Sequence, residues 1–300
     1  MCGQNGGGSF MLVYILCLLI LGIPAMVMEF SVGRASQVSP IYMYKKLSKP
    51  KQKWGVFGWF CLAGNVSLMA FYTVVSGWII YYFAKFLTGN YASLGFSSMI
   101  SEPSVNVIFM AVTVVIAFFI LCFNLQGGLE RVTKYIMSAL LVLMLVLAIH
   151  SLTLSGASEG LAFYLKPDFS KIDGSVMVGA MNQAFFTLST GMGGMAIFGS
   201  YIGKEHSLMG ESVNVILLDT FVAILAGIII FPACFTYGLE VNAGPSLLFD
   251  TMATVFNNMS GGRIWGSLFF MFMIFAAMST VLGVCENILA MIPVSYTHLR

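Results

Sequence analysis

The stretch that decides the fold is residues 182–194, which read NQAFFTLSTGMGG. This stretch lies in a long apolar run, yet its glycines and hydroxyl residues weaken a helix, because glycine is a poor helix former and Ser and Thr compete for backbone groups. Irregular backbone at membrane depth persists only where it is buried in protein or lines a cavity. The carbonyls and helix ends of a broken helix then become ligands for ions and substrates. The alternative is close packing of small residues against a neighbouring helix.

The composition of the whole chain places this stretch in a membrane. Of the 300 residues, 59% are hydrophobic and only 9% are charged, whereas soluble domains are roughly 45–50% apolar and about 25% charged. So little charge cannot cover a water-facing surface, and we predict an all-α, polytopic helix bundle in a lipid bilayer. The formal net charge of +2 leaves no basic face for a nucleic-acid partner. No metalloprotease, nucleophile-elbow or P-loop motif is present, so we expect no enzyme.

Seven runs are long and apolar enough to span a bilayer, which requires about 20 residues. They cover residues 9–32, 55–87, 105–123, 132–152, 176–201, 213–239 and 264–293. Lys and Arg gather in the loop of residues 33–54 and are absent from the loop of residues 88–104. By the positive-inside rule the first of these loops is cytoplasmic, and the chain starts outside.

The two ends of the chain do not fit a complete protein of seven spans. An external start with few residues before the first run, and without a signal peptide, predicts that an upstream span is missing. Residues 296–300, YTHLR, do not continue the helical pattern. We therefore expect a single transmembrane domain over residues 1–295, truncated at both ends, and a tail of foreign origin at residues 296–300.

Three acidic residues lie within the predicted spans, where ionisable groups are costly and indicate function. Glu29 and Glu286 lie towards the ends of their spans, and a capped or solvated carboxylate is an equal alternative for both. Asp219 lies deeper, between Leu218 and Thr220. A carboxylate there requires a cation, a proton or strong hydrogen-bond donors. An interhelical hydrogen bond of the protonated acid is the alternative.

Further polar groups share helix faces. Ala276, Ser279 and Thr280 lie three and four residues apart, so one carbonyl and two hydroxyls meet on one face. Such hard oxygen donors suit an alkali cation, although hydroxyls also bond back to their own helix. Gln183 and Thr187, four residues apart, form another polar face, which we expect to point towards Asp219. Tyr72 adds a phenol to the second span, with an interfacial or packing role as its alternative.

These motifs together resemble the neurotransmitter:sodium symporter family, and bacterial members most of all. The segments that carry the resemblance are residues 5–10, 22–24, 28–30, 33–34, 183–194, 218–232 and 276–280. The resemblance runs along essentially the whole chain except its last residues. It implies the LeuT-like inverted-repeat fold, with the seven runs matching helices two to eight of about twelve. The first helix, which contributes ligands to both sodium ions and to the substrate in that family, has no counterpart here.

The resemblance implies two sodium sites, each only partly present in this chain. The first retains Thr187 and Asp219. The second retains Ala276, Ser279 and Thr280, although the family's usual order of the last two residues is Thr and then Ser. Both hydroxyls therefore remain.

Other positions match the family's substrate and chloride sites. The substrate-pocket positions are Tyr72, Phe186, Ser189, Met192 and Val284. The positions of the chloride site of animal members are Tyr14, Gln183 and Thr187. Chloride-dependent members carry Asn and Ser where this chain has Asp219 and Ala223. A fixed carboxylate at Asp219 supplies the negative charge that chloride supplies elsewhere, so we expect chloride-independent transport.

The resemblance thus implies a sodium-coupled symporter of an amino acid or related amine, located in the plasma membrane of a bacterium and working by alternating access. A seven-helix receptor is the main alternative, because seven spans with an external start fit that topology. That alternative leaves the break near Gly191 and the hydroxyl face at Ser279 unexplained. A channel is the third possibility. The sequence determines neither the identity of the substrate nor the oligomeric state.

Overall fold

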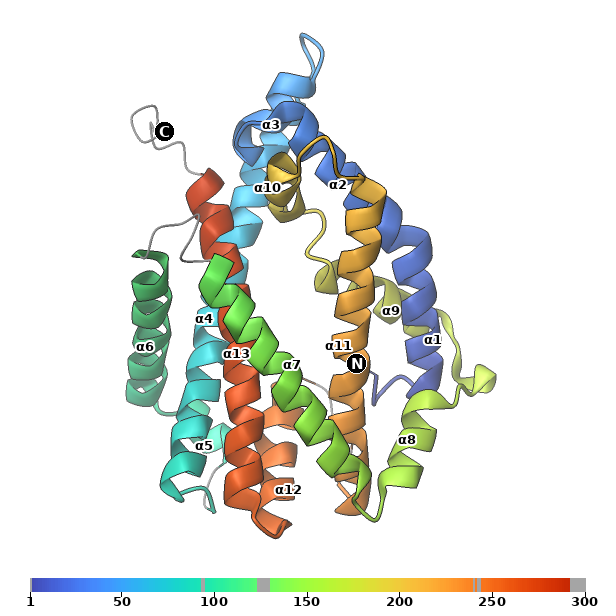
Figure 1. Ribbon diagram of the computed structural model, residues 1–300, viewed down its shortest axis with the longest axis vertical. Coiled ribbons are helices and arrows are strands. Elements are labelled where there is room, and N and C mark those ends of the chain that lie inside the picture. Colours follow the sequence, from blue (N-terminus) through green and yellow to red (C-terminus); the bar gives the residue numbers. More distant parts are fainter. Residues whose placement is uncertain (1, 93–94, 123–129, 240, 242–243, 292–300) are drawn as a thin grey trace. The chain divides into compact units, whose positions relative to one another are not determined.

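Figure 1 shows the computed structural model, which describes residues 2–92, 95–122, 130–239, 241 and 244–291. Every regular element in these residues is helical, as the composition predicts. The α-helices are α1 (Gly8–Cys17), α2 (Ile23–Ser36), α3 (Pro40–Leu47), α4 (Phe57–Thr88), α5 (Phe96–Ile100), α6 (Pro103–Cys122), α7 (Glu130–Leu152), α8 (Ala157–Leu165), α9 (Gly174–Thr187), α10 (Gly194–Tyr201), α11 (Leu208–Thr236), α12 (Met252–Asn258) and α13 (Gly262–Met291). Short 3-10 segments are η2 (Trp54–Val56) and η4 (Phe169–Lys171), and π segments are η1 (Leu18–Gly22) and η5 (Leu247–Thr251). The tail at residues 296–300 lies outside the described residues.

Six helices in the described residues are long and apolar enough to cross a membrane. They are Gly8–Ser36, Trp54–Thr88, Pro103–Cys122, Thr133–Leu152, Leu208–Thr236 and Gly262–Met291. They coincide with six of the seven runs expected from the sequence. The remaining run, residues 176–201, is divided between α9 and α10, and neither helix is long enough to span a bilayer alone. Among the described residues, six continuous spans are found where seven runs are expected, because the run of residues 176–201 is interrupted in the segment for which the sequence predicts irregular backbone.

The contacts divide the chain into two compact units, which are described separately. Unit 1 comprises Met1–Leu12, Phe71–Met177 and Phe221–Leu282. Unit 2 comprises Val13–Ala70, Val178–Thr220 and Gly283–Arg300. Neither unit is continuous in sequence. The expectation of a single domain over residues 1–295 stays a prediction.

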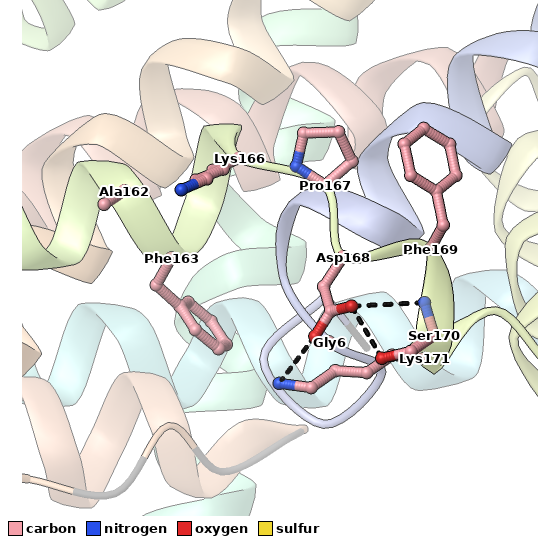
Figure 2. A pocket seen from close by; sticks show the side chains of 9 residues that line it. All are labelled: Gly6, Ala162, Phe163, Lys166, Pro167, Asp168, Phe169, Ser170 and Lys171. Atoms are coloured by element: carbon pink, nitrogen blue, oxygen red, sulfur yellow. Dashed lines mark hydrogen bonds and ion pairs between the residues drawn. The ribbon is translucent and has the colours of Figure 1, made fainter.

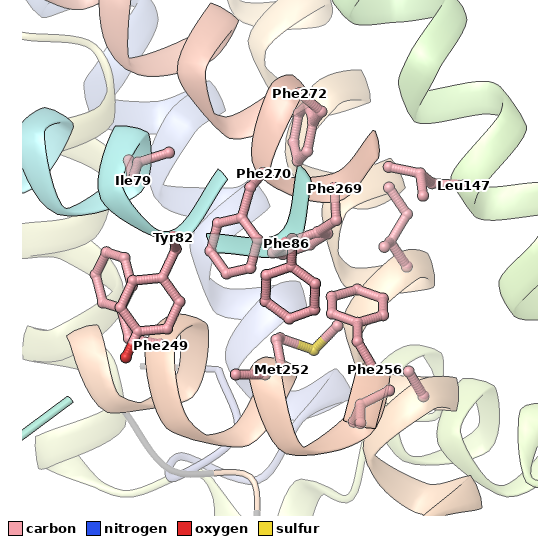
Figure 3. Close-up of a cluster of buried hydrophobic side chains, with 14 of the residues drawn as sticks. Ile79, Tyr82, Phe86, Leu147, Phe249, Met252, Phe256, Phe269, Phe270 and Phe272 are labelled. Carbon is pink, nitrogen blue, oxygen red and sulfur yellow. The ribbon is translucent and has the colours of Figure 1, made fainter. Parts of the chain in front are cut away.

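Unit 1 is built around a cluster of buried aromatic rings (Figure 3). The rings of Phe86 in α4 and Phe270 in α13 stack with their centroids 5.3 Å apart. The ring centroid of Phe249 in η5 lies 5.0 Å from that of Tyr82 in α4. Lipid is as apolar as these side chains, so packing and ring–ring contacts, more than removal from water, hold helices together within a membrane.

Unit 2 brings α2 and α10 into direct backbone contact. A Cβ atom on Gly33 of α2 would lie 1.8 Å from the carbonyl oxygen of Ala196 in α10. A Cβ atom on Gly199 of α10 would lie 2.6 Å from Cα of Phe30. Small residues permit such close approach of helices in membranes. The contact places the beginning of α10 beside α2.

A π segment joins α1 to α2 within the first span. Pro24 has no backbone N–H, so the ordinary helical bond to the carbonyl four residues earlier is missing. One residue earlier, the N–H of Ile23 donates to the carbonyl of Leu18, five residues before it, which is the spacing of a π turn. Such a π turn inserts one residue into the helix and rotates the residues that follow it, including Glu29.

Candidate functional site

The predicted break in the fifth run is confirmed. Helix α9 ends at Thr187, α10 begins at Gly194, and the intervening residues form turns and bends. Three residues of this segment have left-handed backbone: Ser189 (φ 51°), Gly191 (φ 90°) and Gly193 (φ 73°). Two of the three are glycine, which adopts this conformation without steric cost. Ser189 lacks that freedom, so the surrounding contacts have to hold its conformation.

Two buried polar side chains hold the break at one peptide group. The N–H of Gly193 donates to Oε1 of Glu29 at 2.9 Å, and Nδ2 of Asn65 donates to the carbonyl of Met192 at 2.8 Å. Glu29 is therefore a hydrogen-bonded carboxylate, in agreement with the capped alternative. Asn65 was missed by the sequence analysis. The available signal was an amide side chain within the apolar run of α4, the same kind of signal that singled out Asp219.

Glu29 also borders a small hollow in unit 2. Its second oxygen, Oε2, and the hydroxyl of Thr190 are buried and have no hydrogen-bond partner within the described residues. Both residues line a hollow of about 320 Å³, together with Tyr44 and Gly191. The hollow has the polar partners that a bound water requires.

Three polar side chains, those of Tyr14, Gln183 and Thr187, form a hydrogen-bonded network with Asp219 within unit 2. Nε2 of Gln183 donates to the hydroxyl of Thr187 at 3.1 Å. Thr187 is hydrogen-bonded to Tyr14, whose hydroxyl donates to Oδ2 of Asp219 at 3.5 Å. Three helices supply this network, since Tyr14 lies in α1, Asp219 in α11 and the other two residues in α9. The polar face of Gln183 and Thr187 is thus connected to Asp219 through Tyr14, and a direct contact of that face with Asp219 stays a prediction.

Asp219 has no ion pair among the residues that the structure describes. The hydrogen bond that its side chain accepts from Tyr14 is long, at 3.5 Å, and long hydrogen bonds are weak. A carboxylate within a spanning helix is costly unless a cation or a proton neutralises it. The hydrogen bond from Tyr14 joins two helices, as in the alternative of a protonated acid, and the surroundings of Asp219 accommodate either a proton or a cation. The hydroxyl of Thr187 offers a further hard oxygen ligand to a cation.

In unit 1 the three oxygens of the predicted face in α13 converge. The hydroxyl of Ser279 donates to the carbonyl of Ala276 at 2.8 Å, and the hydroxyl of Thr280 donates to the same carbonyl at 3.3 Å. Both hydroxyls bond back to their own helix, as in the structural alternative. Each hydroxyl oxygen keeps lone pairs that can coordinate a cation.

The positions predicted to line a substrate pocket are distributed over both units. Phe186, Ser189 and Met192 lie at the break in unit 2, at the end of α9 and in the segment that follows it. Val284 lies buried in the part of α13 that belongs to unit 2, and Glu286 is half-buried nearby in that helix. Tyr72 is half-buried in the part of α4 that belongs to unit 1.

A larger hollow of about 610 Å³ lies in unit 1 around the turn after α8 (Figure 2). Asp168 accepts from the N–H and hydroxyl of Ser170, and its carboxylate lies 3.8 Å from Nζ of Lys171. The hydroxyl of Ser9 donates to the backbone carbonyl of Asp168 at 2.8 Å and accepts from the backbone N–H of Asp168 at 2.9 Å. These contacts hold the turn against the start of α1. None of the predicted site residues lines this hollow.

Comparison with known proteins assigns the chain to a family. The model of the "Sodium:neurotransmitter symporter family" matches residues 1–104 and 89–299. An "Uncharacterized sodium-dependent transporter" of Haemophilus influenzae is 34% identical, over 96% of this chain and 66% of that protein. The "Uncharacterized sodium-dependent transporter YhdH" of Bacillus subtilis is 35% identical, over 97% and 66%.

A solved structure shows the same fold. The chain matches the crystal structure of MhsT in complex with L-phenylalanine with a TM-score of 0.85 and 38% identity, covering 95% of this chain and 66% of that one. The chain thus spans just under two thirds of the length of these relatives. With its apolar helices it is an integral, multi-pass membrane protein. It is a member of the sodium:neurotransmitter symporter family.

Proposed function

We propose that the protein performs sodium-coupled symport of an amino acid or related amine by alternating access, independently of chloride. Family membership and the sodium dependence named for the relatives support coupling to sodium. They also favour a transporter over a seven-helix receptor or a channel. The proposal places the protein in the plasma membrane of a bacterium.

The observation that carries the proposal is the network around Asp219. A carboxylate within a spanning helix, with one long hydrogen bond from Tyr14, attracts a cation. Two unit charges 4 Å apart attract each other by about 4 kcal/mol at an effective dielectric constant of 20. Asp219 and the hydroxyl of Thr187 would hold the first sodium ion. The carbonyl of Ala276 and the hydroxyls of Ser279 and Thr280 would contribute to the second.

The break supplies the substrate site in this proposal. Tyr72, Phe186, Ser189, Met192 and Val284 would line the pocket, and the phenol of Tyr72 would hydrogen-bond the carboxylate of an amino acid. Met192 and Phe186 present apolar surface to its side chain. MhsT, which was crystallised with L-phenylalanine, supports an amino acid with an apolar or aromatic side chain.

Independence of chloride follows from what occupies the anion position. Tyr14, Gln183 and Thr187 match the chloride-site residues of animal members, and here they are linked to a carboxylate. Asp219 would supply the negative charge that offsets sodium in a low-dielectric site. A second anion beside Asp219 would be repelled.

The test is uptake of radiolabelled amino acids by the full-length protein in liposomes. We expect saturable uptake that requires an inward sodium gradient and that is unchanged when gluconate replaces chloride. Uptake without sodium would refute the coupling, and loss of uptake in gluconate would refute chloride independence. A fixed ratio of sodium to substrate flux distinguishes a symporter from a channel.

A further inference from the structure

The peptide group between Met192 and Gly193 is held at both of its polar ends by buried side chains of two different helices. Asn65 of α4 donates to its carbonyl, and Glu29 of α2 accepts from its N–H. Asn65 is 1% exposed and Glu29 is 8% exposed. Because both hydrogen bonds act on one planar group, they fix its rotation about the chain.

This orientation would otherwise be weakly determined. Met192 lies between Gly191 (φ 90°) and Gly193 (φ 73°), and glycine has more accessible backbone conformations than any other residue. No helical ladder constrains the segment, since α9 has ended and α10 has not begun. The direction in which the side chain of Met192 leaves the backbone depends on the orientation of the peptide group that follows it.

Helix α4 contacts Met192 in a second way. A Cβ atom on Gly64, next to Asn65, would lie 3.6 Å from Cγ and 3.7 Å from Sδ of Met192. The thioether of Met192 therefore packs against the open face of Gly64. Two successive residues of α4 thus position Met192, one through its carbonyl and the other through its side chain.

The cross-helix bond of Asn65 is separable from a bond within its own helix. Nδ2 of Asn65 also donates to the carbonyl of Cys61, four residues earlier, at 2.9 Å. Ser67 of the same helix donates to the carbonyl of Ala63 in the same manner. A serine at position 65 can keep this local bond, but its side chain is too short to reach the break.

We propose that Asn65 is a specificity-determining positioning residue, which holds Met192 against Gly64 and so fixes the wall that the substrate side chain meets. This inference rests on the proposed function, in which Met192 lines the pocket. The substrates concerned are amino acids that differ in the size of an apolar side chain. Asn65 acts through Met192 and contacts no substrate itself.

The experiment compares sodium-dependent uptake of L-phenylalanine, L-leucine and L-alanine by the full-length protein in liposomes. The variants are Asn65→Ser, which keeps the bond within the helix, and Asn65→Leu, which keeps the volume. We expect both to change the ratio of kcat/KM between phenylalanine and alanine by about tenfold, chiefly through KM, because the fit of even one substrate methylene in a hydrophobic pocket is worth about 10–200-fold. The half-saturating concentration of sodium should stay within about twofold, because the Asp219 network remains intact.

Two further variants complete the test. Ser67→Ala removes a hydroxyl from the same helix without touching the break, and it should leave all ratios unchanged. Gly64→Ala keeps the hydrogen bond of Asn65, and its added Cβ would make ordinary contact with the side chain of Met192 at 3.6 Å, so it should also leave the ratios unchanged.

The outcomes separate this inference from the function on which it rests. If the unmodified protein shows no sodium-dependent uptake, the proposed function fails and the specificity role fails with it. If an active protein keeps its substrate ratios in both Asn65 variants, the specificity role alone is wrong. If both variants lower the uptake of all substrates equally, Asn65 supports only the fold, and the inference is overturned.

Discussion

The contact of Gly33 with α10 leads to a sharp prediction for Gly33→Ala. The added Cβ would lie 1.8 Å from the carbonyl oxygen of Ala196, whereas ordinary contact begins at 3.4 Å. The two backbones therefore have to separate by roughly 1.6 Å, because neither helix backbone can yield as a flexible side chain can. Displacement of α10 also strains the bond between Gly193 and Glu29.

The magnitude follows from two opposing effects. Overpacking of a tightly packed site costs about 1–3 kcal/mol, and occasionally more. Replacing Gly by Ala in a helix interior contributes up to about 1 kcal/mol of stability. Because the clash involves backbone atoms, we expect the upper end of the first range and a net loss of about 2 kcal/mol. This loss lowers the ratio of folded to unfolded protein by about 30-fold.

The assay is the free energy of unfolding in a titration from mild detergent to sodium dodecyl sulfate. The matched control is Gly64→Ala in α4, which lies in the same unit and gains the same helix propensity. There the Cβ meets only the side chain of Met192 at 3.6 Å, so no loss is expected. If Gly33→Ala unfolds with the same free energy as Gly64→Ala, the close contact of α2 with α10 is wrong.

Two further predictions concern acidic residues. Asp219→Asn removes the charge that faces the proposed first sodium site. We expect at least a tenfold rise in the half-saturating sodium concentration or a new dependence on chloride. Unchanged sodium and anion dependence would contradict this, and Glu205→Gln on the exposed surface is the control. Bonds from the hydroxyl of Ser175 and the N–H of Val176 lower the pKa of Asp173 at the start of α9. The hydrogen-bonded carboxylate of Asp173 therefore stabilises the first turn of α9 at pH values above 3.8, the ordinary pKa of the group. This stabilisation is lost as the pH falls through the lowered pKa. Hydrogen exchange of the Val176 amide should accelerate in Asp173→Ala at neutral pH, and an unchanged rate would refute the cap.

Local sequence was sufficient for the spans and for the break. Whether a run such as residues 213–239 can span a bilayer depends on its own length and polarity. The irregular backbone between Thr187 and Gly194 likewise follows from the propensities of its own residues. The polar face of Gln183 and Thr187 follows from helical spacing. The number of continuous spans differed: the sequence predicts seven apolar runs, and the described residues contain six long apolar helices. The reason is that the length of an apolar run does not show where its helix is interrupted.

The partners of these residues required the tertiary structure. Tyr14 and Asp219 are 205 residues apart, and Asn65 and Met192 are 127 apart. Residue type indicates that a buried carboxylate or amide needs a partner, but it does not indicate which one. That choice depends on how closely helices approach, as the contact of Gly33 shows. The sequence by itself thus determined the membrane class, the family and the position of the break, because these depend on neighbours along the chain. Only the packing of helices decided that Asn65 and Glu29 hold the break, because hydrogen bonds require their two atoms to lie within about 3 Å in space.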